Sequence, residues 1–207
     1  MKKSNLILYL SLLLNLILLG FGARHVAFKI KQPSQYEQIN PGKNTITFIG
    51  DSRIQLADFA NGLKRNEIAN IGEGGTTAMD WQTRPIQGRT VVIQLGINDI
   101  RQGVPVDSIW IRYRRILCRL KGRVIVTSTI PVHEDIWQDS IPERVMNERV
   151  AELNQRLCVT CHALGIPFVD LSKLNNGIAL DVRYTTDGVH LNSAGNEIIF
   201  NELNRVL

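Results

Sequence analysis

The sequence predicts an α/β protein in which a parallel sheet carries helices on both faces. Two observations support this fold class. Short apolar stretches rich in β-branched residues recur along the chain, and longer amphipathic stretches separate them. This alternation is typical of βαβ units, whose crossover helices cover both faces of a sheet. With 207 residues, the chain is long enough for one domain with a substantial core and short for two.

Five stretches are expected to form the strands, because each is short, apolar and bounded by polar residues or glycine. They are residues 45–49, 67–71, 90–95, 123–130 and 166–171. Helices are expected over residues 57–65, 106–122 and about 143–164, and a last helix is expected to begin near Ser193. Ligands bind at the carboxyl ends of the strands in such sheets. The residues that follow each strand are therefore the candidates for a functional site.

The formal net charge of +5 originates in the N-terminal part of the chain. Residues 1–31 contain five basic residues and no acidic one, so subtracting these five charges leaves residues 32–207 at zero. The predicted domain therefore gives no electrostatic reason to expect nucleic acid as a partner. One local run, RYRRILCRLKGR, places Arg112, Arg115 and Arg119 on one helical face. We interpret this face as solvated, with phosphates or anionic lipid headgroups as the alternative contact.

An apolar stretch near the N-terminus is typical of a membrane-targeting segment. Two lysines precede it, and only Ser11 and Asn15 interrupt it between residues 6 and 23. Its length is at the lower limit for a spanning helix and exceeds the usual core of a signal peptide. We expect residues 1–23 to form a hydrophobic helix that is a signal anchor or, alternatively, a cleaved signal peptide. Residues 24–44 are then a spacer. Residues 45–207 form a membrane-anchored domain outside the cytoplasm, or a periplasmic or secreted one if the leader is cleaved.

The three cysteines, Cys118, Cys158 and Cys161, are too few for a disulfide framework. Cys158 and Cys161 form a C-x-x-C pair, but no second pair and no nearby pair of histidines completes a zinc site. We interpret the cysteines as residues that pack within helices, with one disulfide as the alternative.

Ser52 lies directly after the first predicted strand, in the stretch GDSR. Two roles suit a serine at this point: its hydroxyl can cap the following helix by accepting a free backbone N–H, or it can act as a nucleophile. Taken alone, the cap is favoured because such caps are ordinary helix starts. A nucleophilic serine additionally needs a base within hydrogen-bonding distance, and a third group that orients the base.

A base and its orienting group occur together near the C-terminus, in the stretch DGVH. Asp187 and His190 are three residues apart, so one helical turn would place them on the same side. One imidazole nitrogen would then bond to the carboxylate while the other faces Ser52. A structural role in capping the last helix explains the pair equally well.

Acyl transfer also needs hydrogen-bond donors that face the oxyanion of the tetrahedral intermediate. The backbone N–H of Gly75 in EGGT, the side-chain amide of Asn98 in GIND and the backbone N–H of Ser52 are the candidates. The alternatives are that the glycines only form a tight turn and that Asn98 caps the following segment.

Together, and in this order, these stretches resemble the SGNH hydrolase superfamily, also called the GDSL esterases and lipases. GDSR resembles the nucleophile block, NIGEGGTT the glycine block, GIND the asparagine block and DGVH the D-x-x-H block. The resemblance covers roughly residues 45–207. Two residues depart from the pattern. Arg53 stands where the family name has leucine, a commonly variable position, and Thr76 stands where members often carry an acidic residue.

The resemblance implies a three-layer α/β/α sandwich with a five-stranded parallel sheet, the flavodoxin-like SGNH hydrolase fold. It also implies a hydrolase without a cofactor or metal, and one role for each block. Ser52 is the nucleophile, His190 is the base and Asp187 orients the base. Gly75 and Asn98 stabilise the oxyanion together with the backbone N–H of Ser52.

The loop from Pro131 to Pro142 follows the fourth predicted strand at the same edge of the sheet. His133 and Trp137 are therefore candidates for substrate contacts, and packing on the surface is the alternative. The stretch HED, residues 133–135, does not predict a metal site, because adjacent residues rarely converge on one ion and no partner histidine is nearby.

These observations predict an exported serine esterase that hydrolyses a carboxylic ester through an acyl-enzyme on Ser52. Its expected partners are a small-molecule, lipid or acetylated glycan ester with a short acyl chain, and the membrane through residues 6–23. One alternative is an O-acyltransferase that acts on surface glycan. Another is a catalytically silent domain that binds glycan or lipid, but such a domain has no need for a serine, a base and an oxyanion hole together.

Overall fold

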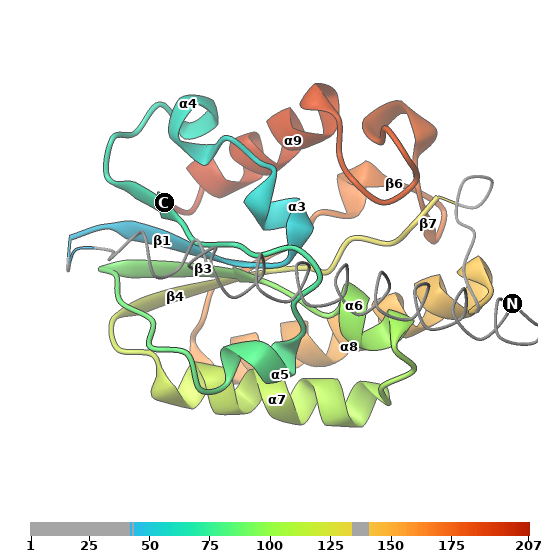
Figure 1. The fold of residues 1–207 in the computed structure, drawn as a ribbon, viewed down its shortest axis with the longest axis horizontal. Helices are drawn as coiled ribbons and strands as arrows, with labels where there is room; N and C mark the ends of the chain where they lie inside the picture. Colours follow the sequence, from blue (N-terminus) through green and yellow to red (C-terminus); the bar gives the residue numbers. More distant parts are fainter. Residues whose placement is uncertain (1–41, 43, 134–140) are drawn as a thin grey trace, which may run out of the picture. The chain divides into compact units, whose positions relative to one another are not determined.

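A five-stranded parallel sheet lies at the centre of the computed structural model (Figure 1). The structure describes residues 42, 44–133 and 141–207. The strands lie in the order β2-β1-β3-β4-β5, and each neighbouring pair is parallel. The predicted five-stranded parallel sheet is therefore confirmed. The strands are β1 (Ile46–Gly50), β2 (Ile68–Asn70), β3 (Thr90–Gln94), β4 (Arg123–Thr127) and β5 (Phe168–Val169).

The order of the strands reverses next to β1. The chain passes from β1 to β2 on one side and then returns to β3 on the other side of β1. Ligand sites of open parallel sheets lie at such a switch point, in the crevice at the carboxyl ends of the two strands. Ser52 follows β1 and Asn98 follows β3. The topology therefore brings these two residues to the same part of the sheet edge.

Helices cover both faces of the sheet and complete a three-layer arrangement (Figure 1). One face carries α3 (Ser52–Gln55), α4 (Phe59–Leu63) and α9 (Ser193–Asn204). The other face carries α5 (Ala78–Trp81), α6 (Ile97–Arg101), α7 (Val106–Arg119) and α8 (Glu143–Leu164). Helix α4 packs against α9, and α7 contacts both α5 and α8.

Burial on both faces explains why β1 and β3 are dominated by apolar residues. Every residue of these two strands is buried. Phe48 of β1 stacks on Phe59 of α4 with ring centroids 3.8 Å apart, and Phe200 of α9 meets Phe59 edge-on. On the opposite face, the buried hydroxyl of Tyr113 donates to the carbonyl of Leu95 and accepts from the N–H of the same residue. This pair of bonds fixes the chain directly after β3.

The predicted helices are present, and two of them are shorter than expected. Helix α7 ends at Arg119 and not at residue 122. Helix α8 has the predicted bounds, and α9 begins at the predicted Ser193. The helix expected over residues 57–65 is reduced to α4. Asp58 caps its first turn, and Lys64 ends it in the left-handed conformation with φ of 53°.

The segment between β5 and α9 contains elements that the sequence did not predict. Strand β5 has only two residues, and the chain then forms an antiparallel pair, β6 (Asn175–Asn176) and β7 (Ala179–Leu180). Two 3-10 turns flank this pair, η1 (Ser172–Leu174) and η2 (Val182–Tyr184). Strands of two residues are too short to show a hydrophobic period, which is why the pattern did not reveal them.

The predicted hydrophobic helix of residues 1–23 lies outside the described residues, as does the spacer except for residues 42 and 44. Within the described ranges, no helix combines the length and the apolar character needed to cross a bilayer. All three cysteines are free. Cys161 is buried in the core as predicted, whereas Cys118 and Cys158 are exposed, so the packing interpretation was wrong for these two.

The basic face of α7 is only partly solvated. Arg115 and Arg119 are exposed, as interpreted. Arg112 instead places Nη1 2.9 Å from a carboxylate oxygen of Asp99, whose side chain is fully buried. A buried carboxylate is destabilising without a counter-charge and hydrogen bonds, and Arg112 supplies both to Asp99. The interpretation of Arg112 as solvated was therefore wrong.

Candidate active site

Ser52 begins α3 directly after the turn at Asp51 that follows β1. The helix is capped by Asp51, whose side chain accepts the backbone N–H of Arg53 at 2.9 Å. The interpretation of Ser52 as the cap was therefore wrong. Gly50 is required just before the turn, because a β-carbon there would lie 2.4 Å from the carbonyl oxygen of Gln94. Ser52 is the first helical residue, and its hydroxyl is directed away from the helix toward another loop.

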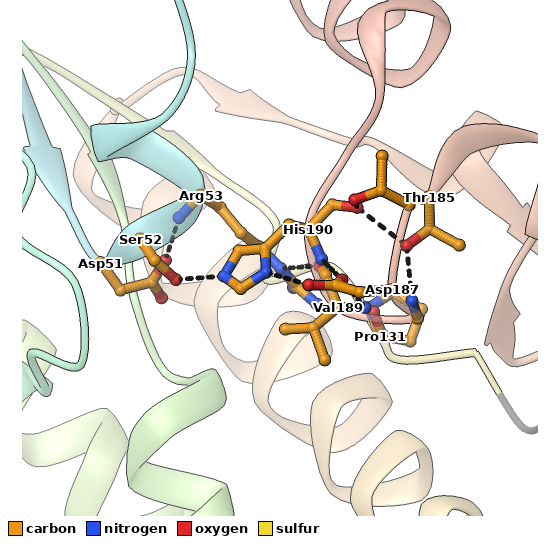
Figure 2. Close-up of polar contacts among 10 residues, drawn as sticks. Asp51, Ser52, Arg53, Pro131, Thr185, Asp187, Val189 and His190 are labelled. Carbon is orange, nitrogen blue, oxygen red and sulfur yellow. Dashed lines mark hydrogen bonds and ion pairs between the residues drawn. The ribbon is translucent and has the colours of Figure 1, made fainter. Parts of the chain in front are cut away.

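A hydrogen-bonded chain links Ser52 to the C-terminal part of the protein (Figure 2). Ser52 Oγ lies 2.9 Å from Nε2 of His190, and Nδ1 of His190 lies 2.6 Å from Oδ2 of Asp187. These are the contacts of a nucleophile, a base and a group that orients the base. The structure thus brings together three residues that are up to 138 positions apart in the sequence.

Asp187 and His190 lie on a turn between η2 and α9, so the expectation of a helical turn was wrong. Oδ1 of Asp187 accepts the backbone N–H of Val189 at 2.9 Å and that of His190 at 2.7 Å. Gly188 supports this turn with φ of 82°. Burial alone would raise the pKa of Asp187, but the hydrogen bonds from His190 and Val189 lower it to about 2. Asp187 is therefore a carboxylate at neutral pH.

Further bonds hold this turn to its neighbours. The hydroxyl of Thr185 accepts the N–H of Gly188 at 2.9 Å and donates to the carbonyl of His190 at 2.8 Å (Figure 2). Asn192 caps α9 by accepting the N–H of Gly195 at 3.0 Å. The alternative in which Asp187 and His190 cap the last helix was therefore wrong.

Two of the candidate oxyanion donors are backbone N–H groups. Gly74 donates its N–H to Oε1 of Gln55 at 2.9 Å, whereas the N–H of Gly75 has no acceptor within the described part of the chain. The N–H of Ser52, at the start of α3, also lacks an acceptor among these residues. Gly75 has φ of +77°, and a β-carbon would meet no described atom within 4 Å. The backbone conformation, not space, favours glycine there.

Asn98 lies inside α6, and Gly96 holds the N-cap position before this helix, so the interpretation of Asn98 as a cap was wrong. Its side-chain nitrogen donates one N–H to the carbonyl of Thr76 at 3.0 Å. A primary amide has two N–H groups, so the second remains for a ligand. The bond to Thr76 connects Asn98 to the loop that carries Gly75.

Four positioning contacts at this edge were not predicted. The hydroxyl of Thr76 contacts the carbonyl of Gly50 at 3.1 Å and accepts the indole N–H of Trp81 at 3.0 Å. Asp99 accepts the N–H of Ala78 at 2.8 Å and pairs with Arg112. Burial raises the pKa of Asp99, and these two partners oppose the rise. The side chains of Thr76 and Asp99 therefore connect the segments that follow β1, β2 and β3.

The predicted substrate-contact residues are only partly within the described structure. His133 is half-buried, and its backbone N–H donates to the carbonyl of Gly188 at 2.8 Å, so it lies beside the loop of His190. Trp137 lies outside the described residues. In the described ranges, no three His, Cys, Asp or Glu side chains are grouped as metal ligands would be.

The fold is a parallel sheet covered by helices on both faces, and Ser52, His190 and Asp187 form one hydrogen-bonded chain in it. Residues 49–198 match the GDSL-like Lipase/Acylhydrolase family. The match covers more than half of the chain, and the chain belongs to this family. The resemblance to the SGNH and GDSL hydrolases is therefore confirmed, and the protein is an ester-bond hydrolase.

Similar proteins extend over most of the chain. The GDSL esterase/lipase WDL1 of Oryza sativa subsp. japonica is 24% identical over 205 residues, which cover 81% of this chain and 78% of that protein. A GDSL-like lipase from Bacteroides thetaiotaomicron has a TM-score of 0.69 at 22% identity, covering 83% and 92% of the two chains. Axe2, an acetylxylan esterase from Geobacillus stearothermophilus, has a TM-score of 0.63 at 18% identity, covering 81% and 94%. At these identities the two solved structures show the shared fold alone.

Proposed function

We propose that this protein is a serine esterase that forms an acyl-enzyme on Ser52. The observation that carries the proposal is the unbroken contact chain from Ser52 Oγ through the ring of His190 to Asp187, with distances of 2.9 and 2.6 Å. The proposal is further supported by the N–H groups of Ser52 and Gly75, which have no acceptor within the described residues.

The chemistry proceeds in two halves. Ser52 Oγ attacks the carbonyl carbon of the ester while its proton passes to Nε2 of His190. The negative carbonyl oxygen accepts hydrogen bonds from the N–H groups of Ser52 and Gly75 and from the amide of Asn98. The imidazolium then gives its proton to the leaving alcohol oxygen as the ester bond breaks. In the second half, His190 takes a proton from water, the hydroxide attacks the acyl-enzyme, and Ser52 regains its proton as the carboxylic acid leaves.

The proposed substrate is a carboxylic ester with a short acyl chain, on a small molecule, a lipid or an acetylated glycan. The similar fold of an acetylxylan esterase makes an acetylated glycan a reasonable first substrate to test. Water is the proposed acceptor of the acyl group, because the family of this chain is one of lipases and acylhydrolases.

We also propose that residues 6–23 attach the protein to a membrane, with the domain outside the cytoplasm. The support is the uncharged apolar stretch preceded by Lys2 and Lys3. A reporter enzyme that works only after export, fused behind Leu207, should be active, and sequencing the mature N-terminus separates an anchor from a cleaved leader. Activity of a reporter that works only in the cytoplasm would contradict this topology.

The esterase proposal is tested with a fluorophosphonate, which reacts with an activated serine. The purified chain should be labelled once, at Ser52, and Ser52→Ala should abolish both labelling and ester hydrolysis. Ser193→Ala is a matched control, because Ser193 is also the first residue of a helix that the preceding residue caps. The control should keep wild-type labelling. Hydrolysis that survives Ser52→Ala would end the assignment of Ser52 as the nucleophile.

A further inference from the structure

Arg53, the residue directly after Ser52, is buried in an unusual way. Its side chain lies inside the protein, and the residue is only 4% exposed. Arginine is seldom buried unless its five N–H donors and its charge are satisfied. The position corresponds to the leucine of the family name, where no polar contact would be made. The burial of a cation at this point therefore calls for a specific explanation.

The guanidinium of Arg53 donates to backbone carbonyls of two separate loops. Nε donates to Val189 at 2.8 Å, in the turn that carries His190 (Figure 2). Nη1 donates to Ile130, and Nη2 donates to Pro131 at 2.9 Å, both in the segment that follows β4. The planar group presents several donors in a fixed fork, so one side chain bridges both loops to the turn of Ser52.

The loops that Arg53 bridges also contact each other. The N–H of His133 donates to the carbonyl of Gly188 at 2.8 Å. Val189, whose carbonyl accepts from Arg53, donates its own N–H to Asp187. Arg53 therefore binds the chain between Asp187 and His190, immediately next to the imidazole. A shift of this short turn would move the imidazole relative to Ser52.

A buried carboxyl group, that of Asp51, interacts electrostatically with the charge of Arg53. Asp51 is 1% exposed, and its side chain accepts the backbone N–H of Arg53. Burial raises the pKa of Asp51, and the charge of Arg53 opposes the rise. Burial lowers the pKa of Arg53 to about 10, so the guanidinium stays charged at neutral pH. A neutral apolar residue at position 53 would remove the positive charge near Asp51. It would also remove the hydrogen-bond donors to Val189, Ile130 and Pro131.

We propose that Arg53 is a positioning residue of the esterase site, which keeps the ring of His190 in line with Ser52 by holding the turn at Val189. The proposal rests on the function proposed above. The guanidinium of Arg53 donates its hydrogen bonds to backbone carbonyls and none to Ser52 Oγ or the imidazole, so it acts through His190 and takes no part in proton transfer. Its effect lies in the alignment of the base, and misplacement of a reacting group by about 1 Å is enough to cost on the order of 100-fold in rate.

Two substitutions separate the donors from the charge. Arg53→Leu removes both, and we expect it to lower kcat for an activated acetate ester by on the order of 100-fold, with little change in KM. Arg53→Lys keeps the charge, but a single ammonium does not reproduce the fork, so its loss should be smaller than that of Arg53→Leu. Arg183→Leu is the matched control. Arg183 is exposed and pairs with Asp181 in the neighbouring 3-10 turn, and its replacement should leave kcat unchanged.

A double-mutant cycle distinguishes positioning from general destabilisation. If Arg53 acts by aligning the imidazole, Arg53→Leu should have little further effect on the residual hydrolysis of a His190→Ala protein. A general loss of structure would lower the rate by the same factor in both backgrounds. If Arg53→Leu does not fold, Arg53→Lys takes its place in the same cycle, with rates corrected for the folded fraction from circular dichroism.

The inference is overturned by wild-type kcat in both folded Arg53 variants, or by equal losses with and without His190. Ser52→Ala, measured in parallel, separates this failure from that of the proposed function. If Ser52→Ala is inactive and the Arg53 variants are fully active, only the role of Arg53 is wrong. If Ser52→Ala remains active, the function on which this inference rests is wrong.

Discussion

The two sides of the candidate site are held in place by different means. Ser52 and Asn98 directly follow β1 and β3, strands in which every residue is buried. Asp187 and His190 lie on a turn outside the sheet, where their side chains are 51% and 32% exposed. The sheet side is positioned by main-chain hydrogen bonds between parallel strands. The turn has a few main-chain bonds, such as that from His133 to Gly188, and it depends in addition on bonds from the side chains of Thr185 and Arg53.

This difference indicates where the site is sensitive to change. A ladder of main-chain hydrogen bonds does not depend on the identity of any one side chain. A turn that side chains hold can be loosened by a single substitution far from the chemistry. We therefore expect the geometry of the base to depend on residues such as Arg53, and the geometry of the nucleophile to depend on the strands themselves.

The largest expected effect is a loss of kcat, caused by the substitution Asp187→Asn in the turn. A carboxylate accepts the N–H at Nδ1 of His190, whereas an amide can present its own N–H and favour the wrong tautomer. We expect kcat to fall on the order of 10⁴-fold, as for an equivalent change in a serine–histidine–aspartate triad. Stopped-flow or steady-state hydrolysis of an activated ester gives the rate, and thermal unfolding shows whether the fold is intact.

Asp181→Asn is the control for that substitution, because Asp181 is a carboxylate of the same segment that pairs with Arg183 and not with His190. It should keep nearly wild-type kcat. If folded Asp187→Asn protein works within tenfold of the wild-type rate, Asp187 does not orient the base.

A smaller loss of kcat is expected from Asn98→Ala, a substitution on the sheet side of the site. Its amide donates to a charge that develops only in the transition state, so its loss should appear in kcat with KM nearly unchanged. The expected fall is about 10²- to 10³-fold, roughly 3 to 4 kcal/mol. Asn176→Ala is the control, because Asn176 is an exposed residue of β6, and it should have no effect.

Asn98→Asp sharpens this test, because a carboxylate has the same shape but repels an oxyanion. Wild-type kcat in folded Asn98→Asp protein, on an ester for which acylation limits the rate, would exclude Asn98 from the oxyanion hole.

The smallest expected effect is on the free energy of unfolding at acidic pH, and it arises from the hydrogen bonds that Asp187 receives. Its pKa is lowered to about 2 in the folded protein from an ordinary value of 3.8. A depressed carboxyl pKa contributes stability that is present above the unfolded value, and that stability is lost as pH falls through the folded one. Because Asp187 is half exposed, we expect its ionisation to contribute about 1 kcal/mol or less to the free energy of unfolding.

The measurement is the difference in urea midpoint between wild-type and Asp187→Asn protein, taken from pH 4 down to pH 2. The wild-type advantage should shrink over this interval. The comparison with the variant matters because Asp181 also has a pKa of about 2, and its titration contributes equally to both proteins. A difference that stays constant from pH 4 to pH 2 would show that the turn does not stabilise the carboxylate of Asp187.

Much of the site was predictable because its residues occur in short local patterns. Ser52, Asn98 and the pair Asp187 and His190 were each selected from a few neighbouring letters, and the structure brings the serine, the histidine and the aspartate together. The roles of their neighbours were not predictable. Nothing in the sequence near Ser52 shows that Asp51, and not the serine, caps α3, because both residue types suit that position.

Arg53 shows most clearly what a local pattern omits. From the sequence it was a variable position next to a nucleophile, and its three acceptors lie 77 to 136 residues away in the chain. The sequence by itself determined the fold class, the succession of the five sheet strands and the longer helices, and the candidate reactive residues at the strand ends, because these follow from hydrophobic periodicity and residue type. Only the tertiary structure decided which carbonyls accept from Arg53 and which residue caps each helix. These contacts join residues that are far apart in the sequence and come together only in the folded protein. A pattern of a few neighbouring residues therefore does not predict them.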